Sequence, residues 1–192
     1  LEVCKKGPIF EPKFIFYKTA SWKKISKESQ KAFRFLLKEF KNNIEVFDEP
    51  SYFKDIPKYH QIIHETDMAN SFQEFYKRSK KKMGKKLIEA IERGLKYSAK
   101  DYVNAVDFMK QSYKSYSEVF EDYYGVITPA SLGVADKGLL STGSPELSTI
   151  WTYMGLPTIS LPLLSGENNL PLGVQLAGDK LDDLRFLASA NW

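Results

Sequence analysis

The fold of this chain is best predicted from Trp151-Thr-Tyr-Met-Gly155-Leu-Pro157-Thr-Ile-Ser-Leu-Pro162 and from the nearby Leu170-Pro171-Leu-Gly173-Val-Gln175-Leu-Ala-Gly178. A glycine ends a short helix at Gly155, and a proline that cannot donate to a strand ladder ends a buried strand at Pro162. A turn-rich loop and a second buried strand follow. Gly173 suits a positive φ or a close backbone approach, and a buried Gln175 needs a hydrogen-bond partner. The two segments therefore predict helix, strand, loop and strand.

The N-terminal region shows a strand, a helix and a second strand with short connections. Phe14-Ile-Phe-Tyr17 is an apolar-aromatic run typical of a strand, and Ile44-Glu-Val-Phe47 alternates like one. Between them Ser26 is a predicted N-cap, and apolar residues follow at helical spacing up to Phe40. Asn42-Asn43 then breaks the helix. This arrangement favours a parallel pair with a crossover helix, and therefore an α/β layer.

The middle of the chain, from Tyr52 to Tyr124, is predicted to be helical. The run from Lys77 to Lys86 is expected to interrupt it as a basic break. Ser98 and Asp101 form a capping-box pattern, and the helix that they begin is expected to continue for about six turns until Gly125 stops it. After it, residues 126–129 are a predicted strand, residues 131–141 a loop, and Ser144-Pro145 the start of a helix. Residues 158–161 and 173–177 are predicted strands, and residues 182–192 a last helix.

Composition describes an ordinary globular protein. Of 192 residues, 43% are hydrophobic and 27% charged, and no apolar run approaches the roughly 20 residues of a membrane span. Residues 1–125 carry 25 basic against 18 acidic residues, whereas residues 126–192 carry 3 against 6. The single cysteine, Cys4, excludes an internal disulfide and fits a cytoplasmic protein, and we interpret it as incidental rather than as a reactive thiol. The first residue is not a start methionine, and the helical pattern at the C-terminal end stops without a cap or a turn. We therefore expect a piece of a longer protein.

Two further motifs have competing interpretations. His60 and His64 share a helix face at the spacing of a zinc-protease helix, but Gln61 replaces the general-base glutamate. We interpret them as surface or half-buried histidines and expect no metal site. The basic run 77–86 could bind phosphate backbones or an anionic membrane. We interpret it as a solvated inter-helix loop, since no aromatic residue lies within it, and expect no membrane partner and an unlikely role for nucleic acid.

Several motifs in order resemble the amidase-signature family of serine hydrolases. The most specific are Gly155-x-Pro157-x-x-x-x-Pro162 and Leu170-Pro171-x-Gly173-x-Gln175. The helix ending at Gly94, the Asp101-Tyr-x-x-Ala105 helix, the strand ending in Thr128-Pro129 and the stretch from Ser141 to Pro145 also match. The resemblance covers nearly the whole chain and is weakest for residues 1–80. Leu147-Ser148 departs from it, because the family often has Phe-Asn there.

The resemblance implies a fold and a role. The implied fold is the C-terminal part of an α/β/α sandwich, with a mixed central sheet and helices on both faces. Residues 1–192 would be a single partial domain with a helical insertion over roughly 52–124. The family uses two serines and a lysine, one serine lying in a glycine-serine-rich loop that also holds the oxyanion. This chain has no such loop, and Ser141-Thr-Gly-Ser144 is best interpreted as a loop and helix cap, so we identify no catalytic residue.

The resemblance also implies where a substrate would lie and which functions compete. Ligands in α/β sheets bind at strand ends and helix starts, which nominates a set of pocket residues. These are Thr128, Pro129, Ala130, Thr142, Gly143 and Trp151. The expected function is that of a C-terminal fragment of a hydrolase that cleaves carboxamide C–N bonds, inactive alone, without a cofactor and homo-oligomeric. The alternatives are a non-catalytic binding or scaffold module and part of the catalytic subunit of a tRNA-dependent amidotransferase.

Overall fold

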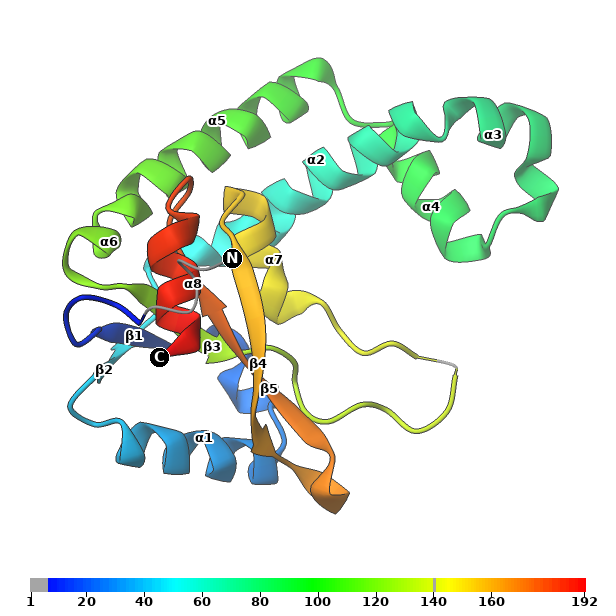
Figure 1. Ribbon diagram of the computed structural model, residues 1–192. Coiled ribbons are helices and arrows are strands. Elements are labelled where there is room, and N and C mark those ends of the chain that lie inside the picture. Colours follow the sequence, from blue (N-terminus) through cyan, green and yellow to red (C-terminus); the bar gives the residue numbers. More distant parts are fainter. Residues whose placement is uncertain (1–6, 140) are drawn as a thin grey trace.

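The computed structural model describes residues 7–139 and 141–192, which are built around one five-stranded sheet (Figure 1). The strands are β1 (Phe14–Lys18), β2 (Ile44–Asp48), β3 (Gly125–Pro129), β4 (Thr158–Ser165) and β5 (Pro171–Ala177). Their order across the sheet is β2-β1-β3-β5-β4. β1 pairs in parallel with β2 and β3, whereas β5 pairs antiparallel with β3 and β4. The sheet is therefore mixed, which confirms the prediction.

The N-terminal unit forms as the sequence predicts. Helix α1 (Lys27–Glu39) connects β1 to β2, and Ser26 caps it by accepting a hydrogen bond on Oγ from the Ser29 N–H at 3.1 Å. The helix stops at Phe40, and the chain turns directly into β2. β1 and β2 are parallel, with Phe14 opposite Ile44. A short crossover helix between adjacent strands makes this parallel pairing possible.

The middle of the chain is helical, and the capping box at its longest helix is confirmed. The Ser98 Oγ accepts from the Asp101 N–H at 3.1 Å, and the Asp101 carboxylate accepts from the Ser98 N–H at 2.9 Å. The α-helices and the two short 3₁₀ helices (η) are η3 (Ser51–Asp55), α2 (Ile56–Ser71), α3 (Gln73–Ser79), η4 (Lys80–Lys82), α4 (Lys85–Gly94), α5 (Ala99–Ser117) and α6 (Val119–Asp122).

Two expectations about this region are wrong. The basic run is not a loop, because α3, η4 and α4 take in all of it except Met83 and Gly84. Gly125 does not end a helix, since α6 already ends at Asp122 and Gly125 is the first residue of β3. A Cβ at Gly125 would lie 2.7 Å from the Leu176 side chain. This glycine therefore permits close packing against β5 rather than a left-handed helix end.

The segment from α7 to β4 matches the prediction at its helix end. Helix α7 (Glu146–Met154) begins one residue after Pro145, slightly later than predicted, and the Ser144 Oγ accepts from the Glu146 N–H at 3.3 Å. At the other end Gly155 has φ 69°, the left-handed conformation expected there. The chain then reverses into β4.

Pro162 has a different role from the predicted one. β4 does not end there but continues to Ser165, with a register shift between Leu161 and Leu164. β4 is also an edge strand whose residues are half-buried or exposed, not a buried strand. Proline is tolerated in edge strands and at bulges because it cannot donate to the ladder. The proline therefore marks an irregular strand edge.

Helices cover both faces of the sheet, which confirms the predicted sandwich (Figure 1). On one face Phe33 and Leu36 of α1 and Phe186 of α8 (Asp183–Asn191) pack on side chains of β1, β3 and β5. On the other face Ile56 of α2, Tyr116 of α5 and residues of α7 form a second apolar cluster. Two further 3₁₀ segments are η2 (Ala20–Lys24) and η5 (Glu167–Asn169).

Cys4 lies outside the described residues, so the interpretation of its thiol stays a prediction. Within residues 7–139 and 141–192, no helix combines the length and the apolar character that a bilayer crossing requires.

Candidate functional site

The predicted pocket wall begins at the end of β3. Thr128 is 1% exposed and Pro129 is also buried, whereas Ala130 is half-buried. The Ala130 N–H donates to the Gly173 carbonyl at 3.1 Å, which extends the pairing with β5 beyond the strand. A Cβ on Gly173 would lie 2.5 Å from the Ser160 Oγ and 3.0 Å from the Ala130 Cβ. Gly173 is thus a position of close approach, as the sequence indicates.

Polar side chains of β3, β5 and α7 gather on one face of the sheet. Thr128 and Gln175 are opposite each other across β3 and β5, and the Ser148 Oγ donates to the Gln175 Oε1 at 3.4 Å. In the part of the chain that the structure describes, Thr128 Oγ1, Gln175 Nε2 and Trp151 Nε1 have no hydrogen-bond partner. An unsatisfied buried polar atom costs about 1–3 kcal/mol. We call Thr128, Ser148 and Gln175 the polar cluster, and two of its atoms, Thr128 Oγ1 and Gln175 Nε2, retain hydrogen-bonding capacity.

The loop after β3 is held against the start of α1. The Ser26 N–H donates to the Leu132 carbonyl at 3.1 Å, and the Ser131 Oγ donates to the Gly133 carbonyl at 2.5 Å. A Cβ on Gly133 would contact Ser26 at 3.9 Å. The strand end and the first turn of α1 are therefore fixed relative to each other.

Thr142 and Gly143 lie in the exposed part of the same loop. Gly143 has φ 79°, and its N–H donates to the Ser141 Oγ at 3.1 Å. Glu146 anchors the end of the loop: its Oε1 accepts from Lys24 Nζ at 3.0 Å, and its Oε2 accepts from Ser144 Oγ at 3.1 Å.

The pKa of Glu146 is lowered by a hydrogen bond from Ser21, together with those from Lys24 and Ser144, which outweigh its desolvation. The anchor is therefore an ionised carboxylate at neutral pH.

Trp151 lies in the core. It is 1% exposed, and its ring centroid is 5.8 Å from that of Tyr116 and 6.3 Å from that of Phe53. The six nominated residues thus occupy three settings: a buried strand end, an exposed loop and an aromatic core. The proposal that they line a substrate pocket stays a prediction.

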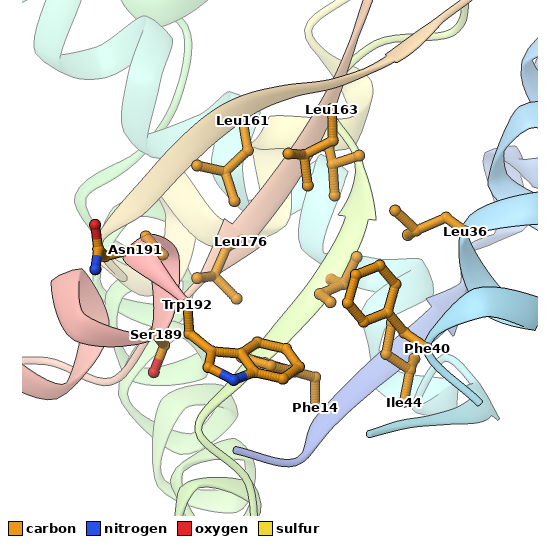
Figure 2. A pocket seen from close by; sticks show the side chains of 13 residues that line it. Phe14, Leu36, Phe40, Ile44, Leu161, Leu163, Leu176, Ser189, Asn191 and Trp192 are labelled. Atoms are coloured by element: carbon orange, nitrogen blue, oxygen red, sulfur yellow. The ribbon is translucent and has the colours of Figure 1, made fainter. Parts of the chain in front are cut away.

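An apolar hollow on the α1 and α8 face lies apart from these residues (Figure 2). It has a volume of about 190 Å³, and we call it the apolar trough. The Trp192 ring stands 5.9 Å from that of Phe14 and 5.8 Å from that of Phe40, which closes one end. Leu161 and Leu163 of β4 form its far wall, as Figure 2 shows. Within the described residues, its lining includes none of the six nominated residues.

The two histidines line a second hollow of about 310 Å³, together with Asp67 of α2 and Tyr153 of α7. Their rings are stacked with centroids 5.4 Å apart, and burial together with the neighbouring His64 lowers the pKa of His60. Among residues 7–139 and 141–192, no group of three or more His, Cys, Asp or Glu side chains is arranged to hold a metal ion. The half-buried interpretation holds for His60, and His64 is exposed.

The loop serines show what chemistry this region can perform. Ser141 bonds to the Gly143 backbone, Ser144 to Glu146, and Ser148 to Gln175. The partners of Ser141 and Ser148 are amide groups, which cannot take a proton from a serine. Ser144 donates to the Glu146 carboxylate, which is held as an anion by Lys24 and is therefore a weak base. The arrangement can position and bind, and it supports the interpretation of Ser141 to Ser144 as loop and cap.

Comparison with known proteins shows which fold this chain has. No protein-family model matches the chain. A solved amidase superposes on 97% of this chain with a TM-score of 0.79 and 21% identity. A bacterial aryl acylamidase of the amidase-signature family superposes on 94% of it with a TM-score of 0.70 and 15% identity. The chain has the amidase-signature fold.

The similarity extends to sequence but covers only part of each relative. The chain is 32% identical over 96 residues to a glutamyl-tRNA(Gln) amidotransferase subunit of Alkaliphilus metalliredigens, which is 46% of this chain and 20% of that protein. It spans 46% of the amidase and 43% of the aryl acylamidase. The amidase-signature fold is thus present here over less than half the length of these solved relatives.

Proposed function

We propose that this chain is the C-terminal portion of an amidase-signature hydrolase that cleaves carboxamide C–N bonds to an acid and ammonia or an amine. The observation that carries the proposal is the superposition of nearly the whole chain on less than half of an amidase. The ordered motifs from Gly94 to Gln175 support it, because they follow the family pattern up to the second strand of the β4–β5 pair.

In this role the chain supplies sheet and pocket walls rather than reacting groups. The end of β3, the loop through Thr142 and Gly143, and Trp151 would shape the substrate site. The polar cluster would orient a carboxamide or a backbone segment of the catalytic half, because its free atoms can still donate and accept hydrogen bonds. The chain has no glycine-serine-rich loop with a lysine partner, so we expect it to be inactive alone.

Two experiments test this proposal. The purified chain is assayed for hydrolysis of aliphatic and aryl amides against a no-protein control, and we expect no turnover. The reading frame upstream of Leu1 is then sequenced, and we expect it to encode a glycine-serine-rich loop and an upstream lysine. Turnover by the chain alone, or an upstream frame without these residues, would contradict the proposal.

A second candidate is part of a tRNA-dependent amidotransferase, which the 32% identity to a subunit of such an enzyme favours. That function predicts binding to tRNA that weakens steeply with salt, because phosphate contacts release counterions. A filter-binding titration with tRNA at two salt concentrations distinguishes it from a simple amidase fragment.

We further propose that residues 1–192 form one partial domain in which roughly 52–124 are a helical insertion. Homo-oligomerisation and a cytoplasmic location belong to the same proposal. The two open sheet edges and the apolar trough support self-association, since unpaired edges and apolar patches promote contacts between copies.

A further inference from the structure

The basic run lies on a hairpin of helices that extends away from the sheet. We define the basic hairpin as residues 73–94, which comprise α3, η4 and α4, at the end of α2 farthest from the strands (Figure 1). The hairpin is closed by Glu92, whose Oε1 accepts from Tyr76 Oη at 2.8 Å and from Lys80 Nζ at 2.7 Å. These contacts give the basic residues a fixed helical frame rather than a flexible loop.

The base of the hairpin is fixed to α2. The Glu65 side chain, 5% exposed, accepts from Arg93 Nη2 at 2.6 Å, from Arg93 Nε at 2.9 Å and from Gln61 Nε2 at 3.1 Å. Gly94 adds a close backbone approach between α4 and α2, where a Cβ would collide with the Glu65 carbonyl. The hairpin is therefore presented in one orientation.

The hairpin carries a surplus of positive charge, and Lys77, Lys80 and Lys85 as well as the two arginines are paired with carboxylates. It holds eight basic against three acidic residues. Both arginines are engaged: Arg78 with Glu74 at 3.3 Å and Arg93 with Glu65. Of the described residues, none forms a salt bridge with Lys81, Lys82 or Lys86, and all three lysines are exposed.

An exposed aromatic side chain accompanies these lysines. Phe75 of α3 is 66% exposed, and Phe72 just before that helix is 38% exposed. The phenylalanine side chain has no polar group, so its exposure to water does not stabilise the protein. The hairpin thus combines unpaired lysines with an exposed phenylalanine, which is the residue composition of segments that lie in a membrane interface.

We propose that the basic hairpin binds the surface of anionic lipid bilayers, with Lys81, Lys82 and Lys86 attracted to lipid phosphates and carboxylates and Phe75 entering the interface. The contact is peripheral and involves no membrane span, and it replaces the expectation from the sequence alone that the run has no membrane partner. Lysine is a compact point charge suited to a diffuse anionic surface, whereas planar bidentate recognition of nucleic-acid phosphates and bases favours arginine. Arg93 is held by the buried Glu65 carboxylate, and the unpaired cations of the hairpin are lysines, which favours the lipid surface over RNA.

The test is co-sedimentation of the full chain with vesicles at low and at physiological salt. We expect binding to vesicles of phosphatidylcholine with phosphatidylserine, weaker binding at higher salt, and none to phosphatidylcholine alone. Each lysine near an anionic surface contributes about fivefold in binding, so Lys81→Gln, Lys82→Gln and Lys86→Gln together should reduce partitioning by about a hundredfold. Phe75→Ser alone should reduce it severalfold and leave the salt dependence intact.

Control variants keep the test specific. Lys100→Gln, Lys110→Gln and Lys114→Gln remove the same charge from exposed positions on α5, where no phenylalanine is exposed, and this variant should bind like the parent chain. Circular dichroism establishes that each variant is folded. Absence of binding to anionic vesicles at low salt, or an equal loss in the control variant, would overturn the proposal. Binding of tRNA that depends on the same three lysines without any vesicle binding would overturn it in favour of an RNA surface.

Discussion

Gly94 is a residue at which two helices meet too closely for any side chain. A Cβ there would collide with the Glu65 carbonyl and lie 3.0 Å from the Ala69 Cβ. We predict that Gly94→Ala lowers the free energy of unfolding by about 1–3 kcal/mol, because the strain of overpacking exceeds the gain in helix propensity. Urea denaturation measures this. Gly7→Ala adds the same methyl group where nothing lies within 4 Å and should not change the stability. Equal free energies of unfolding for the two variants would contradict the close contact between α2 and α4 at Gly94.

Glu65 is the buried charge whose ionisation stabilises the α2–α4 contact. Burial alone would raise the pKa of its carboxyl, but hydrogen bonds from Arg93, Gln61 and Tyr97 and the Arg93 charge outweigh burial and lower it. A carboxyl whose folded pKa is depressed contributes stability above its unfolded pKa of about 4.3 and loses that contribution as the pH falls through the folded pKa.

We therefore predict that the free energy of unfolding decreases less between neutral and acidic pH in Glu65→Gln than in the parent chain. The variant is also less stable at neutral pH. Urea denaturation at several pH values checks both statements. Glu89→Gln, which affects an exposed 3.8 Å pair with Lys85, should retain the pH dependence of the parent. The same acid slope in Glu65→Gln and parent would show that Glu65 is not responsible.

Single-residue roles were predictable where a local rule applies. Ser26 as a cap, Gly155 as a left-handed helix end and Gly173 as a close approach follow from residue type and neighbours. Gln175 was expected to need a partner, and the structure supplies Ser148 for its oxygen only. The Glu65–Arg93 pair was not predictable, because its members lie 28 residues apart on helices whose crossing the sequence does not reveal.

At the scale of elements, the start of α5 depends on its capping box. The Ser98 hydroxyl satisfies the Asp101 N–H, one of the donors that a helix start leaves unpaired. We predict that Ser98→Ala lowers the free energy of unfolding by about 1 kcal/mol. Thermal denaturation followed by circular dichroism measures the change. Ser115→Ala, an exposed position within α5, should be neutral or slightly stabilising, so a loss at Ser115 as large as that at Ser98 would argue against the cap.

Element boundaries were predictable where periodicity and caps agree and less so where tertiary packing decides. α1 and β1 match because apolar spacing and caps are local. Pro162 was expected to end a strand, but an edge strand tolerates it at a bulge, and edge position depends on the strand order. Gly125 has the sequence setting of a helix stop, although its reason is the Leu176 side chain, which lies 51 positions away in the chain.

For the whole molecule, the open edge at β4 and the apolar trough predict self-association. Leu163 lines the trough and is 58% exposed, so Leu163→Lys would place a charge in any contact made there. We expect the parent chain to form dimers or larger species in multi-angle light scattering and Leu163→Lys to shift it towards monomer. Leu139→Lys, at an exposed residue in the loop after β3, should not. A monomeric parent at high concentration would contradict this prediction.

The fold was predictable as a whole because its signals are spread along the chain, whereas the site was not. The end of β3 at Pro129 was correctly located and the start of α7 nearly so, yet Thr128, Thr142 and Trp151 fall into separate settings. Their relation depends on how α7 packs on the sheet, and the apolar trough depends on α1 and α8 meeting across strands distant in sequence. Neither the packing of α7 nor the apolar trough can be predicted from local sequence patterns.

The strand arrangement is the claim on which the amidase-signature fold depends, and cross-strand nuclear Overhauser effects in the isotope-labelled chain test it most directly. We predict contacts of the parallel β1–β3 pair linking Phe14 to Gly125, and of the antiparallel β3–β5 pair linking Ile127 to Leu176. An all-helical spectrum, or a β3 that shows no contact with β5, would contradict the account.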